Sequence, residues 1–290
     1  MVNKSRLVIG CGYLGERVAQ RWLAEGSVVH CVTRSLDRAR HLESLGFKTF
    51  VADVTRPDTL AALPAADTVL YAVGYQPGSG VSRRAVYVDG LQAVLDRLEA
   101  HSSRIVLASS TGVYGESGGA WVDEETPCRP AREAGEVLLA AEETLRGHRL
   151  GSAAIVLRFA GLYGPGRIPK LADLKAGRPI VVSAHGMLNL IHIDDAAAAV
   201  VAAAEAPPPR TYLIADGRPA LRREFYRHVA RLLRAAEPQF VEPTPDEAAR
   251  QRGGGDKRVS NRRMIEELGV ILQYPTYRAG LEAILAASAG

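Results

Sequence analysis

Short apolar runs without polar alternation recur through the first half of the chain, and amphipathic segments separate them. The runs read "RLVIG", "SVVHCVTR", "KTFVAD", "ADTVLYAVG", "SRIVLASS" and "AAIVLRFAG". Strands that are buried on both faces of a parallel sheet have this pattern, and helices form the connections between them. The sequence therefore predicts an α/β fold with a Rossmann-type doubly wound parallel sheet and right-handed crossovers.

The pattern changes after "YGPG" at residues 163–166, where apolar runs become fewer and proline and arginine become more frequent. We interpret residues 1–164 as a Rossmann domain, to which residues 190–215 return, and residues 165–290 as a smaller C-terminal lobe that binds substrate. The pattern contains no internal repeat.

The first predicted strand leads into "GCGYLG", which places Gly10, Gly12 and Gly15 in GxGxxG spacing at the start of a helix. The first glycine permits a tight turn, the second lets the backbone approach a pyrophosphate, and the third lets helix and strand pack closely. The amides at the helix start attract the phosphates. The motif predicts an NAD(P) site that also includes Tyr13 and Leu14.

The end of the second predicted strand, which contacts the adenosine ribose in such sites, reads Thr33-Arg34-Ser35. No carboxylate is present to repel a 2′-phosphate, and an arginine with two hydroxyl neighbours can bind one. The sequence therefore favours NADP(H), with NAD(H) as the alternative. Further cofactor contacts are expected from the ends of later strands, at Asp53, Val54, Ala72, Val73, Gly74 and Ser109.

Composition narrows the class of protein. The 290 residues are 47% hydrophobic with a net charge of +4, and the longest apolar runs are too short to span a membrane. Three cysteines without CxxC spacing indicate neither a disulfide framework nor a metal site. We expect a cytoplasmic protein with no nucleic-acid or membrane partner. The abundant arginines would suit an anionic substrate, although they also fit a general preference for arginine over lysine.

Five motifs occur in a characteristic order: "GCGYLG", "SSTGVYG", "LRFAGLYGPG", "LIHIDDAAAAV" and "DKRVSNRRMIEELG". In this order they resemble the extended short-chain dehydrogenase/reductase family, in its NAD-dependent epimerase/dehydratase group acting on nucleotide sugars. The resemblance covers almost the whole chain. It departs from the family at the glycine loop, because extended members usually carry GxxGxxG, and GxGxxG marks an atypical branch.

The resemblance implies a serine after the fifth strand that works with a Tyr-x-x-x-Lys pair one helix later. Ser110 matches the serine, but Ala134 and Leu138 occupy the tyrosine and lysine positions, and Tyr-x-x-x-Lys occurs nowhere in the chain. The helical neighbours of Ala134 are apolar too, so that face offers no proton donor. Loss of a general acid typically lowers a rate by about 10² to 10⁴, and ordinary alcohol dehydrogenation is not expected.

The remaining candidates for catalysis are Ser110, Tyr114 and Tyr163. Ser110 can bond a substrate oxygen or simply the local backbone, and the two tyrosines lie in motifs that flank the expected cleft. His192 is interpreted as structural, and Asp194 as the N-cap of the alanine-rich helix. Asn261 is a weaker candidate for substrate contact.

Two functions remain open. The first is an NADP(H)-dependent oxidoreductase or epimerase/dehydratase-like enzyme with a non-standard active site, whose proton comes from Ser110, a phenol, the substrate or water. Its substrate would be a small molecule, either anionic or a nucleotide sugar. The second is a non-catalytic NADP(H)-binding sensor or scaffold. The apolar periodicity of "YVDGLQAVLDRLEA" and "GEVLLAAEETLRG" would allow a homodimer, although packing on the sheet requires the same pattern.

Overall fold

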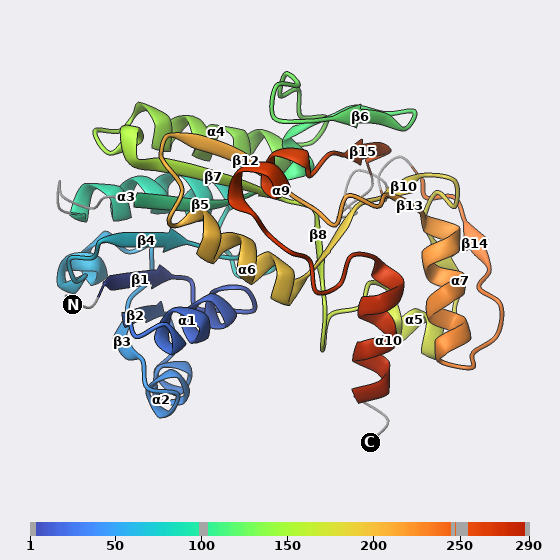
Figure 1. Ribbon diagram of the computed structural model, residues 1–290, viewed down its shortest axis with the longest axis horizontal. Helices are drawn as coiled ribbons and strands as arrows, with labels where there is room; N and C mark the ends of the chain where they lie inside the picture. Colours follow the sequence, from blue (N-terminus) through green and yellow to red (C-terminus); the bar gives the residue numbers. More distant parts are fainter. Residues whose placement is uncertain (1–3, 99–103, 245–246, 248–254, 288–290) are drawn as a thin grey trace.

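The structure of the chain is a computed structural model that describes residues 4–98, 104–244, 247 and 255–287. Its centre is a seven-stranded sheet with the order β12-β7-β5-β4-β1-β2-β3, and every neighbouring pair is parallel (Figure 1). The strands are β1 (Ser5–Ile9), β2 (Val28–Thr33), β3 (Lys48–Val51), β4 (Thr68–Tyr71), β5 (Arg104–Ser110), β7 (Ala154–Phe159) and β12 (Arg210–Ile214).

The order of the strands reverses at the middle of the sheet. The chain adds β2 and β3 on one side of β1 and then returns to add β4, β5, β7 and β12 on the other side. Loops that leave the carboxyl ends of β1 and β4 therefore diverge and form the crevice where such sheets bind ligands. The predicted α/β doubly wound parallel sheet is confirmed.

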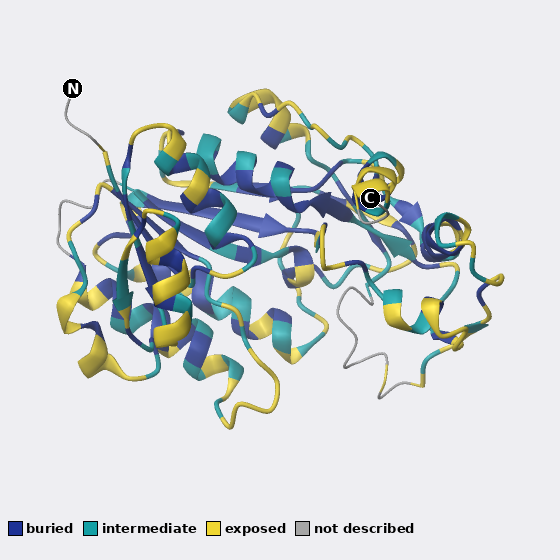
Figure 2. Cartoon of the chain, turned by 90° about the horizontal axis from the view of Figure 1, so that it is seen from below, coloured by how far each residue is buried: buried dark blue, intermediate teal, exposed yellow. Residues whose placement is uncertain are grey.

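Helices cover both faces of the sheet (Figures 1 and 2). On one face α1 and α6 pack on a core that includes Val8, Trp22 and Val200, and on the other face α3 and α4 pack on a core that includes Ile9, Leu91 and Leu145. The helices of this part are α1 (Gly15–Ala24), α2 (Leu36–Ser44), α3 (Gly90–Arg97), α4 (Glu133–Gly147), α6 (Ile193–Ala203) and α9 (Arg262–Leu268). Short turns of 3-10 helix occur at Pro57–Ala62, Thr111–Val113 and Gly151–Ala153, and a π turn at Ala85–Asp89 leads into α3.

The sequence of each helix explains the face that it buries. In α1 the buried residues Gly15, Val18, Ala19 and Trp22 follow the i, i+3, i+4, i+7 spacing of one helical stripe. Figure 2 shows the result for the whole molecule, with buried strands at the centre and exposed residues on the outer faces of the helices.

A smaller lobe lies beyond the carboxyl edge of the sheet. It has its own core, which includes Phe225, Tyr277 and Leu281. Its helices are α5 (Leu171–Lys175), α7 (Arg222–Leu232) and α10 (Tyr277–Ala287), and its strand pairs are β9 (Ile180–Val181) with β14 (Phe240–Val241) and β10 (Met187–Leu188) with β13 (Ala220–Leu221).

Two further strand pairs join the lobe to the main sheet. In one pair β8 (Gly161–Tyr163) runs parallel to β11 (Leu190–His192), and in the other β6 (Ala120–Val122) runs parallel to β15 (Lys257–Val259). In the second pair, β15 near the C-terminus lies beside β6, which belongs to the segment that follows β5. Among the helices that the structure describes, none is long and apolar enough to cross a membrane.

Candidate functional site

The glycine loop joins β1 to α1 at the crevice, where the sequence places it. Gly10 has a φ of +89°, and a Cβ on it would lie 2.7 Å from the backbone of Val73. A Cβ on Gly15 would lie 2.6 Å from the carbonyl oxygen of Gly10. Because backbone atoms cannot move aside cheaply, both positions require glycine.

Gly12 is different, because a Cβ on it would meet no atom within 4 Å. Its Cα faces open space at the start of α1, and no side chain caps the N-terminus of that helix. The Glu16 amide donates to the Gly12 carbonyl oxygen at 2.9 Å, and the other amides of the first turn, beside a side-chain-free Cα, form a cradle that fits a diphosphate. The residues present therefore fit the dinucleotide that the motif implies.

Arg38 of α2 holds this loop in place, and no sequence motif pointed to it. Its guanidinium donates to the Cys11 carbonyl oxygen at 3.2 Å and pairs with the Glu16 carboxylate. Behind the loop, the pKa of the Cys31 thiol is raised by its hydrogen bond with Cys11 and by burial. Cys11 of the loop and Cys31 of β2 are therefore buried packing residues.

The three residues that would contact the adenosine ribose lie at the end of β2. Arg34 is exposed, and among the described residues its guanidinium forms no hydrogen bond or salt bridge. Ser35 accepts the Arg38 amide at 3.4 Å and caps α2, while Thr33 Oγ1 accepts the Ser35 amide at 3.5 Å. Arg34 thus stands beside two hydroxyl groups that the local turns already orient.

The strand ends next to this position are shaped by local hydrogen bonds. Asp53 Oδ1 accepts the amide and the hydroxyl of Thr55, at 2.9 and 2.8 Å. Partial burial raises the pKa of Asp53, but these bonds and the charge of Arg34 lower it further, and the net shift is downward. Val54 is buried, whereas Ala72 and Val73 are half-buried and Gly74 is exposed at the end of β4.

Tyr13, which follows Gly12, connects the glycine loop to the lobe. Its hydroxyl donates to the Pro165 carbonyl oxygen at 3.1 Å, and its ring lies under the guanidinium groups of Arg17 and Arg167 at 4.5 and 5.4 Å. Leu14 is buried. The glycine loop and the "YGPG" turn are therefore joined through one aromatic side chain.

A buried ion pair fixes α4 over the sheet, and sequence reasoning missed it. Glu142 of α4 is 0% exposed and accepts two hydrogen bonds from Arg158 of β7, at 3.0 and 2.7 Å. Ser109 donates to the same carboxylate at 2.6 Å. Because the Ser109 hydroxyl is used in this way, only the backbone of this residue remains for the predicted cofactor contact.

Ser110 lies at the carboxyl end of β5, directly before the turn that meets α4. Its Oγ accepts the Gly112 amide at 3.1 Å, which is the local backbone bond considered from the sequence. That bond uses a lone pair of the oxygen and leaves the hydroxyl hydrogen for another acceptor. A Cβ on Gly135 would lie 2.3 Å from the Gly112 carbonyl oxygen, so α4 starts against this turn.

The N-terminal part of α4 carries no acid or base toward the cleft. Ala134 and Leu138, at the positions of the family's tyrosine and lysine, are half-buried, and Leu138 packs against the core that contains Tyr114. Glu133 and Glu136 are exposed. These two carboxylates therefore lie at the surface, and the face of Ala134 and Leu138 is apolar, as the helical spacing predicted.

The two candidate tyrosines are buried with their hydroxyl groups close to protein atoms. Tyr114 accepts a hydrogen bond from Arg158, and Tyr163 lies 3.4 Å from the Thr276 carbonyl oxygen. Burial raises the pKa of both phenols. Phenols in these surroundings are poor proton donors, and the geometry favours them as packing groups.

The weaker candidates have structural partners. His192, not Asp194, is the N-cap of α6: its Nδ1 accepts the Asp194 amide at 3.3 Å, so the predicted aspartate cap is wrong. The imidazole reaches the amide because β11 runs directly into the helix, and its ring centroid lies 3.9 Å from that of Tyr274, with the two rings tilted by 46°. Asn261 donates to the Ala215 carbonyl oxygen at 3.0 Å.

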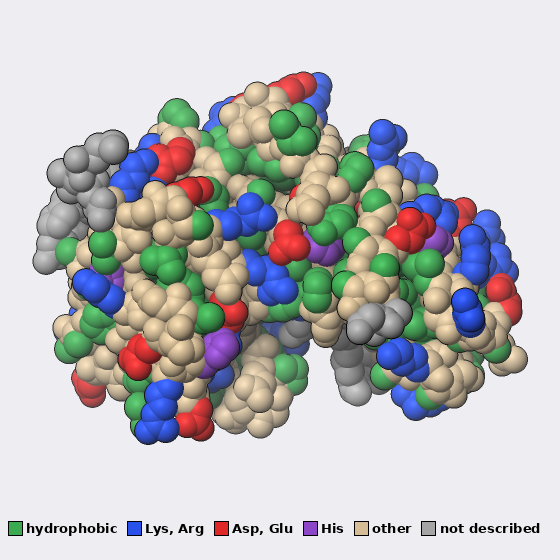
Figure 3. All heavy atoms as spheres, turned by 60° about the horizontal axis from the view of Figure 1, so that its bottom comes forward, with side chains coloured by type: hydrophobic (Ala, Val, Ile, Leu, Met, Phe, Trp, Pro, Cys, Tyr) green, Lys and Arg blue, Asp and Glu red, His purple; other side chains and the backbone are tan. Residues whose placement is uncertain are grey.

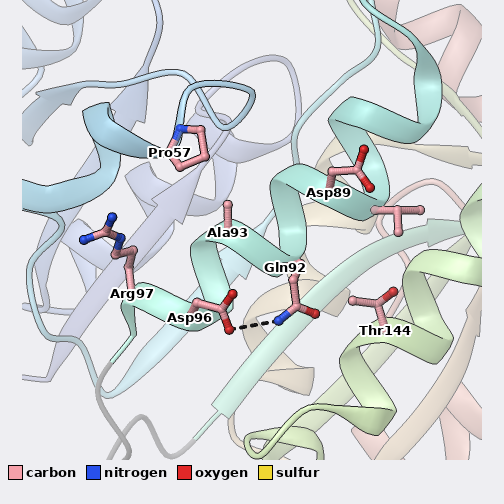
Figure 4. A pocket seen from close by; sticks show the side chains of 8 residues that line it. Pro57, Asp89, Gln92, Ala93, Asp96, Arg97 and Thr144 are labelled. Carbon is pink, nitrogen blue, oxygen red and sulfur yellow. Dashed lines mark hydrogen bonds between the residues drawn. The ribbon is translucent and has the colours of Figure 1, made fainter.

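Two hollows of the described surface bear on where a ligand could lie. Figure 3 shows a recess between the main domain and the smaller lobe, with Lys and Arg side chains on both parts. A separate hollow of about 450 Å³ lies over α3 and α4, where Gln92 donates to Asp96 at 2.9 Å (Figure 4). The second hollow contains none of the predicted cofactor residues. Within the described ranges, no group of three or more His, Cys, Asp or Glu could hold a metal ion.

The chain is similar to known proteins both in sequence and in fold. The model of the NAD dependent epimerase/dehydratase family matches residues 6–215. Protein YeeZ of Escherichia coli K12 is 32% identical over 281 residues, which are 94% of this chain and 97% of that protein.

Two solved structures extend the likeness. A conserved protein of unknown function from Silicibacter pomeroyi is 27% identical, with a TM-score of 0.80, and the match covers 99% of this chain and all of that chain. The UDP-glucose 4-epimerase of Thermus thermophilus, solved with NAD, is 20% identical, with a TM-score of 0.81 over 99% of each chain. The latter likeness concerns the fold.

Proposed function

The chain belongs to the NAD-dependent epimerase/dehydratase family, and from that membership we propose that it binds NADP(H) and acts as an oxidoreductase or epimerase/dehydratase-like enzyme with a non-standard active site. The observation that carries the proposal is the open space at Gly12 beside the uncapped start of α1. A structural glycine would be packed against neighbours, as Gly10 and Gly15 are. Among the three glycines of the GxGxxG loop, Gly12 is the one that leaves space at the start of α1, where a diphosphate would need it.

Each part of the crevice then has a role in cofactor binding or in the reaction. The first-turn amides of α1 bind the diphosphate, and Arg34 with its hydroxyl neighbours contacts the adenosine ribose. When bound, the nicotinamide supplies a hydride or accepts one. Ser110 donates a hydrogen bond that orients the substrate oxygen, and the apolar start of α4 excludes water from the reacting carbon.

A nucleotide sugar is the substrate class we propose. The support is the complete second lobe with its own core, together with the full-length likeness to a UDP-glucose 4-epimerase fold. The alternative is an NADP(H)-binding sensor or scaffold, which the apolar face around Ala134 and Leu138 favours. That alternative leaves the lobe, the recess and the free hydroxyl hydrogen of Ser110 without a role.

The choice of cofactor can be tested at Arg34. Because a charge-assisted hydrogen bond contributes about 1.5–3 kcal/mol, Arg34→Ala is expected to weaken NADPH binding by roughly 10- to 100-fold. NADH binding should change by less than about twofold. Fluorescence titration of the two reduced cofactors measures both constants.

Arg40→Ala provides the matched control for this variant. Arg40 is also exposed, lies on α2 and pairs with Asp37 on the same helix. It should leave both affinities unchanged. Equal losses for NADPH and NADH in Arg34→Ala would reject the assignment of Arg34 to the 2′-phosphate.

Turnover decides between the enzyme and the sensor. NADPH-saturated protein should oxidise or reduce at least one member of a panel of carbonyl compounds, imines and nucleotide sugars, followed by cofactor absorbance and product analysis. Ser110→Ala should lower kcat by about 10- to 100-fold through the lost hydrogen bond, while the Kd for NADPH stays within twofold. Tight NADPH binding with no turnover and a cofactor-dependent change in oligomeric state would favour the sensor instead.

A further inference from the structure

Lys257 is an unusual lysine for this chain. All five lysines lie in described parts of the structure, and Lys257 is the one that is buried, with 7% of its surface exposed. It lies on β15, which pairs with β6 in the loop that follows β5. Its Nζ donates to the Tyr114 carbonyl oxygen at 2.7 Å. A residue from near the end of the chain thus inserts its amine between the lobe and the main domain.

A series of contacts carries this amine toward the start of α4. Tyr114 forms a parallel bridge with Arg129. A Cβ on the next residue, Gly115, would lie 2.2 Å from the Arg129 carbonyl oxygen and 3.0 Å from the Ala131 amide. The turn at residues 114 and 115, whose Tyr114 carbonyl holds Nζ, is therefore packed against residues 129–131, three residues before Ala134, where the family's tyrosine would be.

Charged groups from three other segments face Lys257. Glu116 follows the same turn, Arg132 precedes α4, and Arg222 begins α7 and is 4% exposed. The Oε2 atom of Glu116 is buried and has no hydrogen-bond partner among the described residues. The neighbouring Asp256 accepts the Met187 amide at 2.8 Å.

These surroundings lower the pKa of the Lys257 amine toward neutral pH. The pKa of Lys257 is lowered to about 8, chiefly by burial, with Glu116 acting to raise it and both arginines acting to lower it. An amine with such a pKa exists in both forms at neutral pH and can give or take a proton. Arginine cannot do so, and the phenols of Tyr114 and Tyr163 are buried with raised pKa values.

We propose that Lys257 is the proton-transfer group of this site and acts in place of the tyrosine that is absent at position 134. The inference rests on the proposed function. In the reductive direction the N–H bond of the ammonium breaks and an O–H bond forms at the substrate carbonyl oxygen. The carbonyl carbon gains a hydride from the reduced nicotinamide, which is oxidised, and Lys257 is left as the neutral amine. The oxidative direction reverses each step.

The first test is the titration of the wild-type protein with saturating NADPH. Labelling lysine with ¹³C at Cε gives five NMR signals, and the signal lost in Lys257→Arg identifies Lys257. Its midpoint is expected near pH 8, whereas exposed lysines titrate near 10.4. A midpoint near 10 for Lys257 would overturn the proposal without reference to any substrate.

The second test uses the substrate that the wild-type protein turns over. Lys257→Met should lower kcat by about 10² to 10⁴-fold while the Kd for NADPH stays within twofold. Lys257→Arg keeps the positive charge but cannot release a proton, so it should be as slow as Lys257→Met. In the wild-type protein the reductive kcat should fall about tenfold per pH unit above pH 8 as the ammonium is lost, and this decline should disappear in both variants. Lys175→Met, at an exposed lysine of α5, is the control and should behave as wild type.

The outcomes separate the two proposals. If the Lys257→Arg variant kept a kcat near that of the wild type, only the positive charge would matter, and the role of Lys257 in proton transfer would be overturned. A kcat within threefold of wild type in Lys257→Met would overturn it as well, although the proposed function would stand. Wild-type protein that fails to bind NADPH would overturn the proposed function, and the inference with it.

Discussion

Replacement of Glu142 by alanine is expected to lower the free energy of unfolding by about 3–5 kcal/mol, the cost of leaving one member of a buried ion pair without its partner. Glu142 is fully buried and receives hydrogen bonds from Arg158 and Ser109, and Arg146 pairs with it at 2.7 Å. Its loss would strand the Arg158 guanidinium, which is 5% exposed, between α4 and β7. Urea unfolding followed by circular dichroism measures the change.

Glu143→Ala is the matched control, because Glu143 is the next residue of the same helix and is exposed. It should change the free energy of unfolding by less than about 0.5 kcal/mol. A loss below about 1 kcal/mol in Glu142→Ala would mean that the pair contributes little to the fold.

The effect of Glu142 should also depend on pH. Burial alone would raise the pKa of Glu142, but the hydrogen bonds and the charge of Arg158 hold it below its usual range. A carboxyl group whose pKa is lower in the folded than in the unfolded state stabilises the fold at pH values above the unfolded pKa. The advantage of the wild type over Glu142→Ala should therefore be full at pH 7 and shrink as the pH falls through the acid range.

Gly12→Val is expected to weaken NADPH binding by at least about 100-fold, which corresponds to the loss of two hydrogen bonds to a charged group. The valine side chain would occupy the space at the start of α1 that a diphosphate needs. Since a Cβ at this position meets no protein atom within 4 Å, the free energy of unfolding should stay within about 0.5 kcal/mol of the wild type. Isothermal calorimetry and thermal unfolding together measure both quantities.

Gly15→Ala is the informative comparison for this variant. Its Cβ would lie 2.6 Å from the Gly10 carbonyl oxygen, so it should destabilise the fold itself. Gly12→Val that binds NADPH as well as the wild type would show that no diphosphate rests at this cradle.

The sheet and the glycine loop could be predicted because their signals are local. A buried parallel strand is a continuous apolar run, and the turn from β1 to α1 depends on three glycines within six residues. The six predicted runs correspond to β1, β2, β3, β4, β5 and β7, and the resemblance to the epimerase/dehydratase family is confirmed by the family model.

The side chains around the reacting end could not be predicted in the same way, because their partners are distant in sequence. Lys257 meets a carbonyl 143 residues earlier, and nothing within "DKRV" distinguishes a buried lysine from an exposed one. The prediction of the N-cap of α6 was wrong for a related reason. Both His192 and Asp194 can accept an amide hydrogen bond, and the residue at which the helix begins decides which one does so.

The position of β12 has a consequence for how the molecule is made. This strand is an edge of the main sheet, yet it follows α5, β9 and β10 of the lobe in the chain. During synthesis the nucleotide-binding half cannot be completed when residue 164 leaves the ribosome, since its last strand emerges about fifty residues later. The two halves are thus interleaved, and a cut after residue 164 would separate β12 from the sheet whose edge it forms.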